Sequence, residues 1–441
     1  MRESGRVFRL SYGSGWAFGD VLLPHFAGVI PYNRGMLWQP PLPPRYRTMS
    51  DTELAEAIRV CKAELGNQLV ILGHHYQQDE VIQFADFTGD SFKLSQLAAQ
   101  RVKEVGAKYV IFCGVHFMAE SADILTPDDV QVILPDLSAG CSMADMADYD
   151  DTVDAWEYLQ NLFAGTNTRI IPLCYMNSTA AIKAFCGEHG GAVTTSSNCR
   201  QVFEWALAGG TQPRREGETI KIFFLPDQHL GRNTAAEMGY DVTTATCVWD
   251  PRAASRPAAS GLPTIRAADD HCTDEQIRQA TFILWKGHCS VHMLFRPEHV
   301  DQVRAEWPDV TVIVHPECRH EVVQKADMTG STEGIIKTLR AAKPGTRWAI
   351  GTEVHMVDRL CREVAERGVQ ARILSSCQCL CTTMYRIDMP HLLWAMDNLA
   401  EGKVVNQVKV DPQVKQWALV ALNRMLQITG APSAPTPAPV R

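Results

Sequence analysis

The chain has 441 residues, of which 46% are hydrophobic and 21% charged, and its formal net charge is -8. These values are typical of a globular protein and exclude a disordered or collagen-like chain. No block of lysine and arginine indicates nucleic-acid binding, and no apolar run approaches the roughly 18 residues of a membrane span. At roughly 150 residues per domain, the length allows about three domains. We recognise no signal peptide and expect a cytoplasmic protein without nucleic-acid or membrane partners.

Residues 1–49 are predicted to be an N-terminal extension, with an extended, proline-rich surface segment at 40–44. The folded body is expected to begin at Ser50, which forms a capping box with Glu53. Apolar residues then follow at helical spacing up to Gly66, which is expected to end the helix.

The body of the chain repeats one pattern of four strands three times. The first strand of each repeat ends in polar ring side chains, in segments 68–76, 170–177 and 310–317. The second ends in hydroxyl residues, in segments 86–91, 193–198 and 327–332. The third strands are expected in segments 109–114, 220–227 and 347–353. The fourth segments each end in a cysteine, at 132–141, 282–289 and 373–381.

Strands that alternate with helices indicate parallel α/β units, which place ligands at the carboxyl ends of their strands. We therefore predict three similar small α/β domains with Rossmann-like parallel sheets around a pseudo-threefold axis, with the site at the centre. The alternative is three unrelated Rossmann-like domains that share only a local rhythm. The predicted domains are 50–141, 142–289 and 290–381. A surface insertion is expected at about 241–275, C-terminal helices at 382–428 and a disordered tail at 429–441.

The 14 cysteines are spread over the chain, which favours buried thiols and a metal site over a disulfide framework. One cysteine ends each repeat: Cys141, Cys289 and Cys381. Three thiolates would fill all but one position of a cubane iron–sulfur cluster and leave one iron open as a Lewis acid. Zinc with three protein ligands and a water is the competing interpretation. Cys377 and Cys379, in the same C-x-C-x-C segment as Cys381, are also interpreted as a thiol pair without a metal role.

Polar residues at the strand ends supply candidate proton carriers. They are His74, Tyr76, Tyr175, His292, His315 and Glu317. Ser91, Ser196 and Thr332 each lie where a strand leads into a helix N-terminus, a position that binds anionic groups. Three such positions predict a substrate with several acidic groups, whereas ordinary N-capping is the alternative. No nucleotide-binding loop is present, so ATP and NAD are not indicated as ligands.

Several of these motifs together resemble the quinolinate synthase family, in the family's order, over roughly residues 50–428. The resemblance implies a [4Fe-4S] enzyme built from three α/β domains around a pseudo-threefold axis. It also implies the condensation of iminoaspartate, supplied by L-aspartate oxidase, with dihydroxyacetone phosphate to form quinolinate in the de novo synthesis of NAD. The motifs are GHHYQQDEVIQFADFTGDS, AGCSMADM, YMNSTAAIKA, TSSN, PDQHLGRN, KGHCSVH, HPEC, GST and a terminal C-x-x-M.

By motif, the resemblance implies cluster ligation by three cysteines: Cys141, Cys289 and Cys381. It implies three catalytic residues: His74, Tyr76 and Glu317. It implies substrate binding by seven more: Ser91, Tyr175, Asn177, Ser196, His292, His315 and Thr332. The chain departs from the family pattern at His75, at Cys199, in the N-terminal extension and in the insertion.

Two functions of other classes remain as alternatives. An iron–sulfur hydro-lyase could use the same open iron on a hydroxy acid, but it would not need a phosphate site. A non-catalytic redox sensor would hold the cluster, but it would not need anion sites and proton carriers on every repeat.

Overall fold

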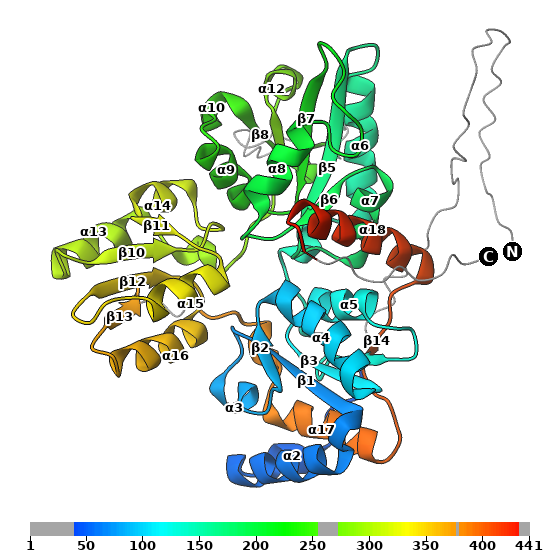
Figure 1. Ribbon diagram of the computed structural model, residues 1–441, viewed down its shortest axis with the longest axis vertical. Coiled ribbons are helices and arrows are strands. Elements are labelled where there is room, and N and C mark those ends of the chain that lie inside the picture. Colours follow the sequence, from blue (N-terminus) through cyan, green and yellow to red (C-terminus); the bar gives the residue numbers. More distant parts are fainter. Residues whose placement is uncertain (1–38, 255–271, 376–378, 432–441) are drawn as a thin grey trace, which may run out of the picture. The chain divides into compact units, whose positions relative to one another are not determined.

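The computed structural model describes residues 39–254, 272–375 and 379–431, and their strands form three sheets (Figure 1). In hydrogen-bonded order, the first sheet contains β14 (Gln407–Val408), β4 (Gln131–Ile133), β3 (Tyr109–Cys113), β1 (Leu69–His74) and β2 (Phe87–Gly89). The second contains β6 (Ala192–Thr194), β5 (Thr168–Tyr175), β7 (Thr219–Leu225), β9 (Phe282–Trp285) and β8 (Thr246–Trp249). The third contains β11 (Met328–Thr329), β10 (Thr311–Val314), β12 (Arg347–Gly351) and β13 (Gln370–Ile373).

All twelve predicted strands are present, and the three sheets share one topology. In each sheet the four strands of the repeat lie in the order second, first, third, fourth, and every pairing among them is parallel. Such pairing brings the carboxyl ends of the strands to the same edge of each sheet. The prediction of three similar α/β units is therefore confirmed. The alternative, three unrelated domains that share only a similar local order of strands and helices, is not supported.

Helices connect the strands of each repeat and cover the sheets. In the first repeat, α4 (Ser91–Val105) and α5 (His116–Leu125) lie on one side of the sheet in Figure 1, and α2 (Asp51–Leu65) lies on the other. The predicted capping box of α2 is present, because Ser50 N–H donates to Glu53 Oε2 at 2.8 Å and the Ser50 hydroxyl accepts from Glu53 N–H. Gly66 ends this helix, as expected.

The remaining connections are also helical. The first and second repeats further contain α3 (Asp79–Ile82), α6 (Tyr149–Leu162), α7 (Ala180–Glu188), α8 (Cys199–Leu207), α9 (Gln228–Glu237), α10 (Val242–Ala245), α11 (Pro251–Ala254) and α12 (Asp274–Gln279). The third contains α13 (Pro297–Glu306), α14 (His320–Lys325), α15 (Thr332–Arg340) and α16 (Val354–Ala365).

The C-terminal segment completes the first two repeats instead of forming a separate layer. Helix α17 (Met389–Ala400) packs on α2, and β14 pairs antiparallel with β4. Helix α18 (Pro412–Ile428) packs on α7 and β6 of the second repeat. The first two α/β units are therefore built from segments that are far apart in the sequence.

Two expectations about chain organisation require correction. The folded body begins before Ser50, because α1 (Pro44–Thr48) packs on α17 and buries Tyr46, while Leu42 is also buried. Proline near the first turn of a helix is compatible with its geometry, which explains why the proline-rich segment leads into α1. The predicted surface insertion is wrong for residues 246–249, since β8 pairs with β9 in the second sheet. Residues 1–38, 255–271 and 432–441 lie outside the described part of the chain.

A buried polar contact joins the first and second repeats. The Glu120 carboxylate on α5 accepts a hydrogen bond of 2.9 Å from Ala180 N–H at the start of α7. Lys183 is fully buried on α7 and donates to Ser121 Oγ and to the carbonyl of Ser178, both at 2.8 Å. Burial lowers the pKa of Lys183 to about 8. The two hydrogen bonds offset part of the free-energy cost of burying the Lys183 ammonium away from water.

The third repeat is tied to its neighbours through backbone carbonyls. The amide of Asn233 on α9 donates to the carbonyls of Pro316 and Cys318, each at 2.8 Å. From the other side, the Arg359 guanidinium on α16 donates to the Gln77 carbonyl at 2.6 Å. Both contacts hold loops that follow the first strand of a repeat.

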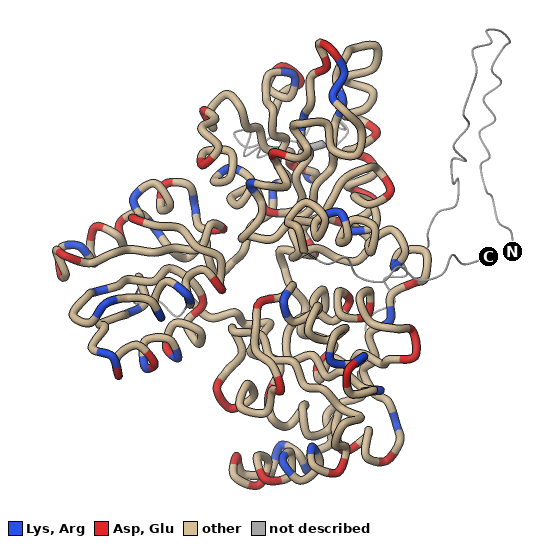
Figure 2. Tube along the Cα trace, viewed as in Figure 1, with Lys and Arg blue, Asp and Glu red and all other residues tan. Residues whose placement is uncertain are grey.

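None of the helices in the described residues is long and apolar enough to cross a membrane. Lysine and arginine are interspersed with aspartate and glutamate along the chain trace in Figure 2.

The packing of α18 on α7 gives a first testable prediction. A Cβ atom at Gly187 would lie 2.0 Å from the Trp417 carbonyl oxygen, a backbone atom that cannot move without shifting α18. We expect Gly187→Ala to lower the free energy of unfolding by about 1–3 kcal/mol through overpacking, measured by urea denaturation. The matched control is Glu188→Ala at the exposed next position, which should change it by less than about 0.5 kcal/mol. Equal stability of the two variants would contradict this packing argument.

Candidate active site at the carboxyl ends of three sheets

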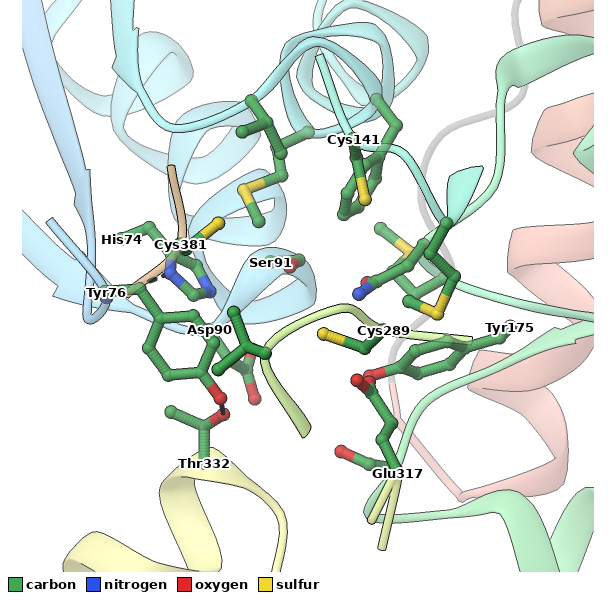
Figure 3. Close-up of a pocket in the computed structure, with 18 of the residues that line it drawn as sticks. His74, Tyr76, Asp90, Ser91, Cys141, Tyr175, Cys289, Glu317, Thr332 and Cys381 are labelled. Carbon is green, nitrogen blue, oxygen red and sulfur yellow. Dashed lines mark hydrogen bonds between the residues drawn. The ribbon is translucent and has the colours of Figure 1, made fainter. Parts of the chain in front are cut away.

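One cavity receives side chains from all three repeats (Figure 3). The structure brings every site residue predicted from the sequence to its wall. They are His74, Tyr76, Ser91, Cys141, Tyr175, Asn177, Ser196, Cys289, His292, His315, Glu317, Thr332 and Cys381. Their convergence follows from the parallel pairing of the four strands of each repeat, which brings the carboxyl ends of these strands to one edge of each sheet. The roles assigned to these residues stay predictions.

The three cysteines face one another across the cavity. In Figure 3 the thiols of Cys141, Cys289 and Cys381 point towards the space between them from three separate segments. Each thiol follows the fourth strand of its repeat, namely β4, β9 or β13. In all three repeats, therefore, the segment after the fourth strand carries the cysteine that faces the cavity.

A short 3₁₀ helix follows each of these cysteines at the same distance. The helices are η2 (Ala144–Met146), η3 (His292–Leu294) and η4 (Met384–Arg386), and each begins three residues after its cysteine. The backbone N–H of that first helical residue lowers the pKa of the cysteine thiol in every repeat. Hydrogen bonds to sulfur favour the thiolate form, which is the form that ligates iron.

The C-x-C-x-C segment is divided by the fold. Cys381 lines the cavity, whereas Cys379 is fully buried in an apolar cluster of the third repeat that contains Val314 and Leu374. Cys377 lies outside the described residues. These placements support the choice of Cys381 over Cys379 as the candidate ligand.

The distances between the three thiols help to decide between a single zinc ion and an iron–sulfur cluster as the group that they bind. Two zinc–sulfur bonds of about 2.3 Å hold two sulfurs within about 4 Å of each other. Among the described residues, the group with ligand atoms all within 4.8 Å is Cys289, His292 and Glu317, and it contains no second cysteine. The three cavity thiols do not form such a close group, so they fit ligands on separate irons of a cluster better than ligands on one zinc ion.

The first strands of the repeats end in related pairs of residues. The pairs are His74 with Tyr76, Tyr175 with Asn177, and His315 with Glu317. In two repeats the backbone N–H two residues on donates to the histidine Nδ1, at 3.1 Å for His74 and 3.3 Å for His315. A neutral ring that accepts at Nδ1 carries its proton on Nε2. Both imidazoles therefore offer the cavity an N–H donor.

These two histidines are held in the neutral form. Burial lowers the pKa of His74 to about 3 and the pKa of His315 to about 3. Near neutral pH each ring is a hydrogen-bond donor without a positive charge.

A second imidazole lies beside a buried carboxylate. His292 Nδ1 lies 2.8 Å from Glu317 Oε2, and the His292 ring stacks on His315 with centroids 4.4 Å apart. Burial alone would raise the pKa of Glu317, but the adjacent imidazoles of His315 and His292 lower it below its ordinary value. Glu317 is thus ionised and is a hydrogen-bond acceptor at the cavity wall.

The two cavity tyrosines have the opposite character. Burial raises the pKa of Tyr76 and of Tyr175 well above the ordinary phenol value, and the charge of Glu317 adds to the effect in both cases. The Tyr76 hydroxyl contacts Thr332 Oγ1 at 3.1 Å and Thr352 Oγ1 at 2.9 Å. Both phenols keep their protons near neutral pH.

The three predicted anion-binding hydroxyls are not the capping groups of their helices. Asp90 caps α4 and Ser331 caps α15, so Ser91 and Thr332 occupy the next position in each helix. Ser196 lies in the loop before α8 and does not cap that helix. The N-capping interpretation of these hydroxyls is therefore wrong, and all three line the cavity instead.

Sequence reasoning missed several polar residues at this site, among them Thr195 and Thr383 on the cavity wall. Asp90 lines the cavity beside Ser91, and its place in the DFTGDS segment was an available signal. Thr352 is fully buried behind the cavity wall and contacts both Tyr76 and His292. It follows β12, the third strand of its repeat. The sequence analysis predicted no site residue after any of the third strands.

The neutral histidines predict a pH dependence of stability. An unfolded histidine titrates near pH 6.5, whereas His74 in the folded protein does so at about 3. Between these values the unfolded state binds more protons, so stability falls as the pH is lowered. We expect urea denaturation to show that His74→Gln reduces the loss of unfolding free energy between pH 7 and pH 5 by about 2 kcal/mol. Parallel pH dependences of wild type and variant would contradict a neutral buried ring.

Comparison with known proteins agrees with this geometry. Residues 56–427 match the family model described as "Quinolinate synthetase A protein". A quinolinate synthase of Acidobacterium capsulatum is 54% identical over 385 residues, which cover 87% of this chain and 95% of that relative. A quinolinate synthase of Nocardioides sp. is 52% identical over 413 residues, which cover 93% of this chain and 97% of that relative. The chain therefore belongs to the quinolinate synthase family, which acts in NAD biosynthesis.

Proposed function

We propose that this chain condenses iminoaspartate with dihydroxyacetone phosphate to form quinolinate, with loss of phosphate and water. The observation that carries the proposal is the cavity in which three thiols, three imidazoles, two phenols and the carboxyl groups of Asp90 and Glu317 meet. Family membership supports the same reaction. The proposal implies a functional link to L-aspartate oxidase, the enzyme that would supply iminoaspartate.

We further propose that the three cavity thiols hold a [4Fe-4S] cluster. Three features of the chain support this: one cysteine from each repeat, backbone donors aimed at each sulfur, and a largely apolar surround. The surround includes Phe117, Met118, Met143, Met176, Val291 and Met384. When bound, such a cluster supplies an open iron that acts as a Lewis acid for a substrate oxygen.

Proton release should accompany metal binding at these thiols. Burial raises the pKa of Cys141 to about 12 and raises the pKa of Cys289 and of Cys381 as well. Without metal the thiols are protonated at neutral pH, so iron must displace their protons.

The remaining cavity residues suit two acidic substrates. The hydroxyls of Ser91, Ser196 and Thr332 approach from three repeats and can donate to carboxylate or phosphate oxygens. The Nε2 protons of His74 and His315 add two donors that carry no charge of their own. A substrate with several acidic groups is thereby oriented by donors from different directions.

Proton transfer is proposed for Tyr76 and Glu317. Tyr76 is a protonated phenol, and Glu317 is an ionised carboxylate on a different repeat. Ring formation with loss of water and phosphate requires protons both to be removed and to be delivered. A group of each kind within reach of the substrate meets that requirement.

The alternatives predict different outcomes in one experiment. An anaerobic assay of the reconstituted protein with iminoaspartate and dihydroxyacetone phosphate should yield quinolinate and inorganic phosphate in equal amounts. A hydro-lyase would instead dehydrate a hydroxy acid, and a sensor would form no product. A cluster-loaded protein that forms no quinolinate would contradict the proposed reaction.

Cluster ligation is tested by single alanine substitutions. We expect Cys141→Ala, Cys289→Ala and Cys381→Ala each to lose cluster absorption, because each variant keeps only two of the three thiolates that hold the cluster. Protein purified without oxygen should contain about four irons per chain, and each variant far fewer. Cys379→Ala is the matched control and should keep its iron, since that side chain lies in the apolar cluster. Loss of iron in Cys379→Ala but not in Cys381→Ala would reverse the ligand assignment.

Proton transfer is tested by removing one functional group at a time. Tyr76→Phe and Glu317→Gln should each lower kcat by at least about 10²-fold, the usual contribution of one acid–base group. Cluster absorption serves as the folding control and should stay normal in both variants. Near-normal turnover in both would refute these roles without refuting the reaction.

A further inference from the structure

Two cysteines outside the candidate active site lie in contact at the edge of the second sheet. Cys247 belongs to β8, and Cys272 directly precedes Thr273, the residue that caps α12. The Cys272 N–H donates to the carbonyl of Val248 at 3.0 Å. Because β8 is the last strand of its sheet, this bond places Cys272 along the open side of β8.

This backbone bond brings the two side chains within reach of each other. Segments that are hydrogen-bonded through their backbones run about 4.8 Å apart, and disulfides join cysteines whose Cα atoms are roughly 4.4–6.8 Å apart. The thiols of Cys247 and Cys272 share a side-chain hydrogen bond, and both cysteines are free. A disulfide between them therefore requires little movement of β8 or of the start of α12.

The pair lies just beneath the surface of the second repeat. Cys247 is 7% exposed and Cys272 is 5% exposed. Tyr158 is itself an exposed side chain, and its ring contacts Trp249 of β8 with centroids 5.3 Å apart. Its hydroxyl is hydrogen-bonded to Asp274, two residues after Cys272. The thiols are thus within reach of a small reagent from this face.

We propose that Cys247 and Cys272 form a dithiol site, which a low-molecular-weight disulfide oxidises to an intramolecular disulfide between β8 and the start of α12. The first thiolate attacks a sulfur of the reagent, whose S–S bond breaks and releases one small thiol. The second thiolate then attacks the mixed disulfide, so the protein S–S bond forms and the second small thiol leaves. Two electrons pass from the cysteines to the reagent, and the two cysteine protons go to the departing thiols.

The surroundings of the two thiols give the reaction an order. The hydrogen bond with Cys272 and burial raise the pKa of Cys247, while the Lys221 ammonium acts in the opposite direction. Cys247 is therefore protonated near neutral pH, and attack on the reagent begins at Cys272. Once Cys272 carries the small thiol, its hydrogen bond with Cys247 is lost. The Lys221 ammonium then favours the Cys247 thiolate that closes the disulfide.

The cross-link fastens α12 to the sheet. In the reduced protein, Lys221 on β7 donates to the carbonyl of Arg278 in α12 at 2.8 Å. The disulfide adds a covalent attachment at the other end of this helix. It also closes the segment 247–272 into a loop, which lowers the conformational entropy of the unfolded chain. Oxidation therefore raises thermal stability. Since neither cysteine lines the cavity, this inference does not rest on the proposed reaction.

A second thiol pair in the same repeat is the matched control. Cys186 on α7 shares a side-chain hydrogen bond with Cys174 on β5. Both residues are 0% exposed, and α18 packs on α7. A reagent that reaches only the surface of the folded protein leaves this pair reduced, so its oxidation would report unfolding.

Anaerobic oxidation with bis(2-hydroxyethyl) disulfide tests the site on cluster-reconstituted protein. After incubation, free thiols are blocked with N-ethylmaleimide and the peptides are analysed by mass spectrometry without reduction. We expect a linked peptide pair that contains Cys247 and Cys272 and has the mass of the reduced peptides less two hydrogen atoms. The thermal midpoint should rise by at least about 2 °C. Dithiothreitol should reverse both changes.

Single serine substitutions separate the disulfide from other effects of the reagent. In Cys247→Ser and Cys272→Ser no internal disulfide can close, so oxidation should leave the thermal midpoint within about 1 °C of its reduced value. Cys186→Ser should keep the full increase. Recovery of Cys247 and Cys272 as maleimide adducts, or equal formation of a Cys174–Cys186 link, would overturn the proposed site. An unchanged midpoint in protein that carries the disulfide would overturn its role in fastening α12.

Discussion

Parallel hydrogen bonding within three sheets is the constraint on which the rest of this structure depends. It forces the carboxyl ends of neighbouring strands to the same edge, so each repeat presents the end of its first, second and fourth strand together. These ends carry the imidazoles and phenols, the hydroxyls and the cysteines, respectively. No single repeat contains a complete site. Function therefore requires that three such edges face one cavity.

The relative placement of the repeats is maintained by contacts that do not follow chain order. Helices α17 and α18 lie late in the sequence but pack on the first and second repeats. Asn233 and Arg359 donate hydrogen bonds to backbone carbonyls next to the strand ends, including the carbonyls of the residues that flank Glu317. Because these donors bind main-chain atoms, they hold the loops that carry the candidate site residues in place.

Burial decides the charge of most groups at the site. The imidazoles of His74 and His315 are neutral and the phenols of Tyr76 and Tyr175 are protonated, because desolvation disfavours the charged form in each case. Glu317 is the exception, because its hydrogen bond with His292 helps to keep the pKa of this carboxyl group below its ordinary value. The cavity thus offers several neutral donors beside the ionised carboxylate of Glu317, and contacts through Thr352 and His292 connect Tyr76 to that carboxylate.

The amino-acid sequence by itself determined the four strands of each repeat, the start of α2 and the thirteen residues that meet in the cavity. These features depend on local pattern: apolar runs, a capping box, and polar residues at repeated strand ends. Local pattern failed where packing against distant segments decides the outcome. Residues 40–44 read as an extended surface segment because α17, on which the following helix α1 packs, lies far away in the sequence. Residues 246–249 read as an insertion because only pairing with β9 makes them a strand.

Only the tertiary structure decided which groups touch. The choice between Cys379 and Cys381 follows from which side chain enters the apolar cluster and which faces the cavity. The link from Tyr76 through Thr352 to His292 joins residues from three distant segments at distances near 3 Å. Periodicity and spacing describe neighbours along the chain, whereas a hydrogen bond of this kind depends on how three sheets pack. The sequence therefore determined the chemical groups of the site, and the packing of the repeats determined which of those groups touch.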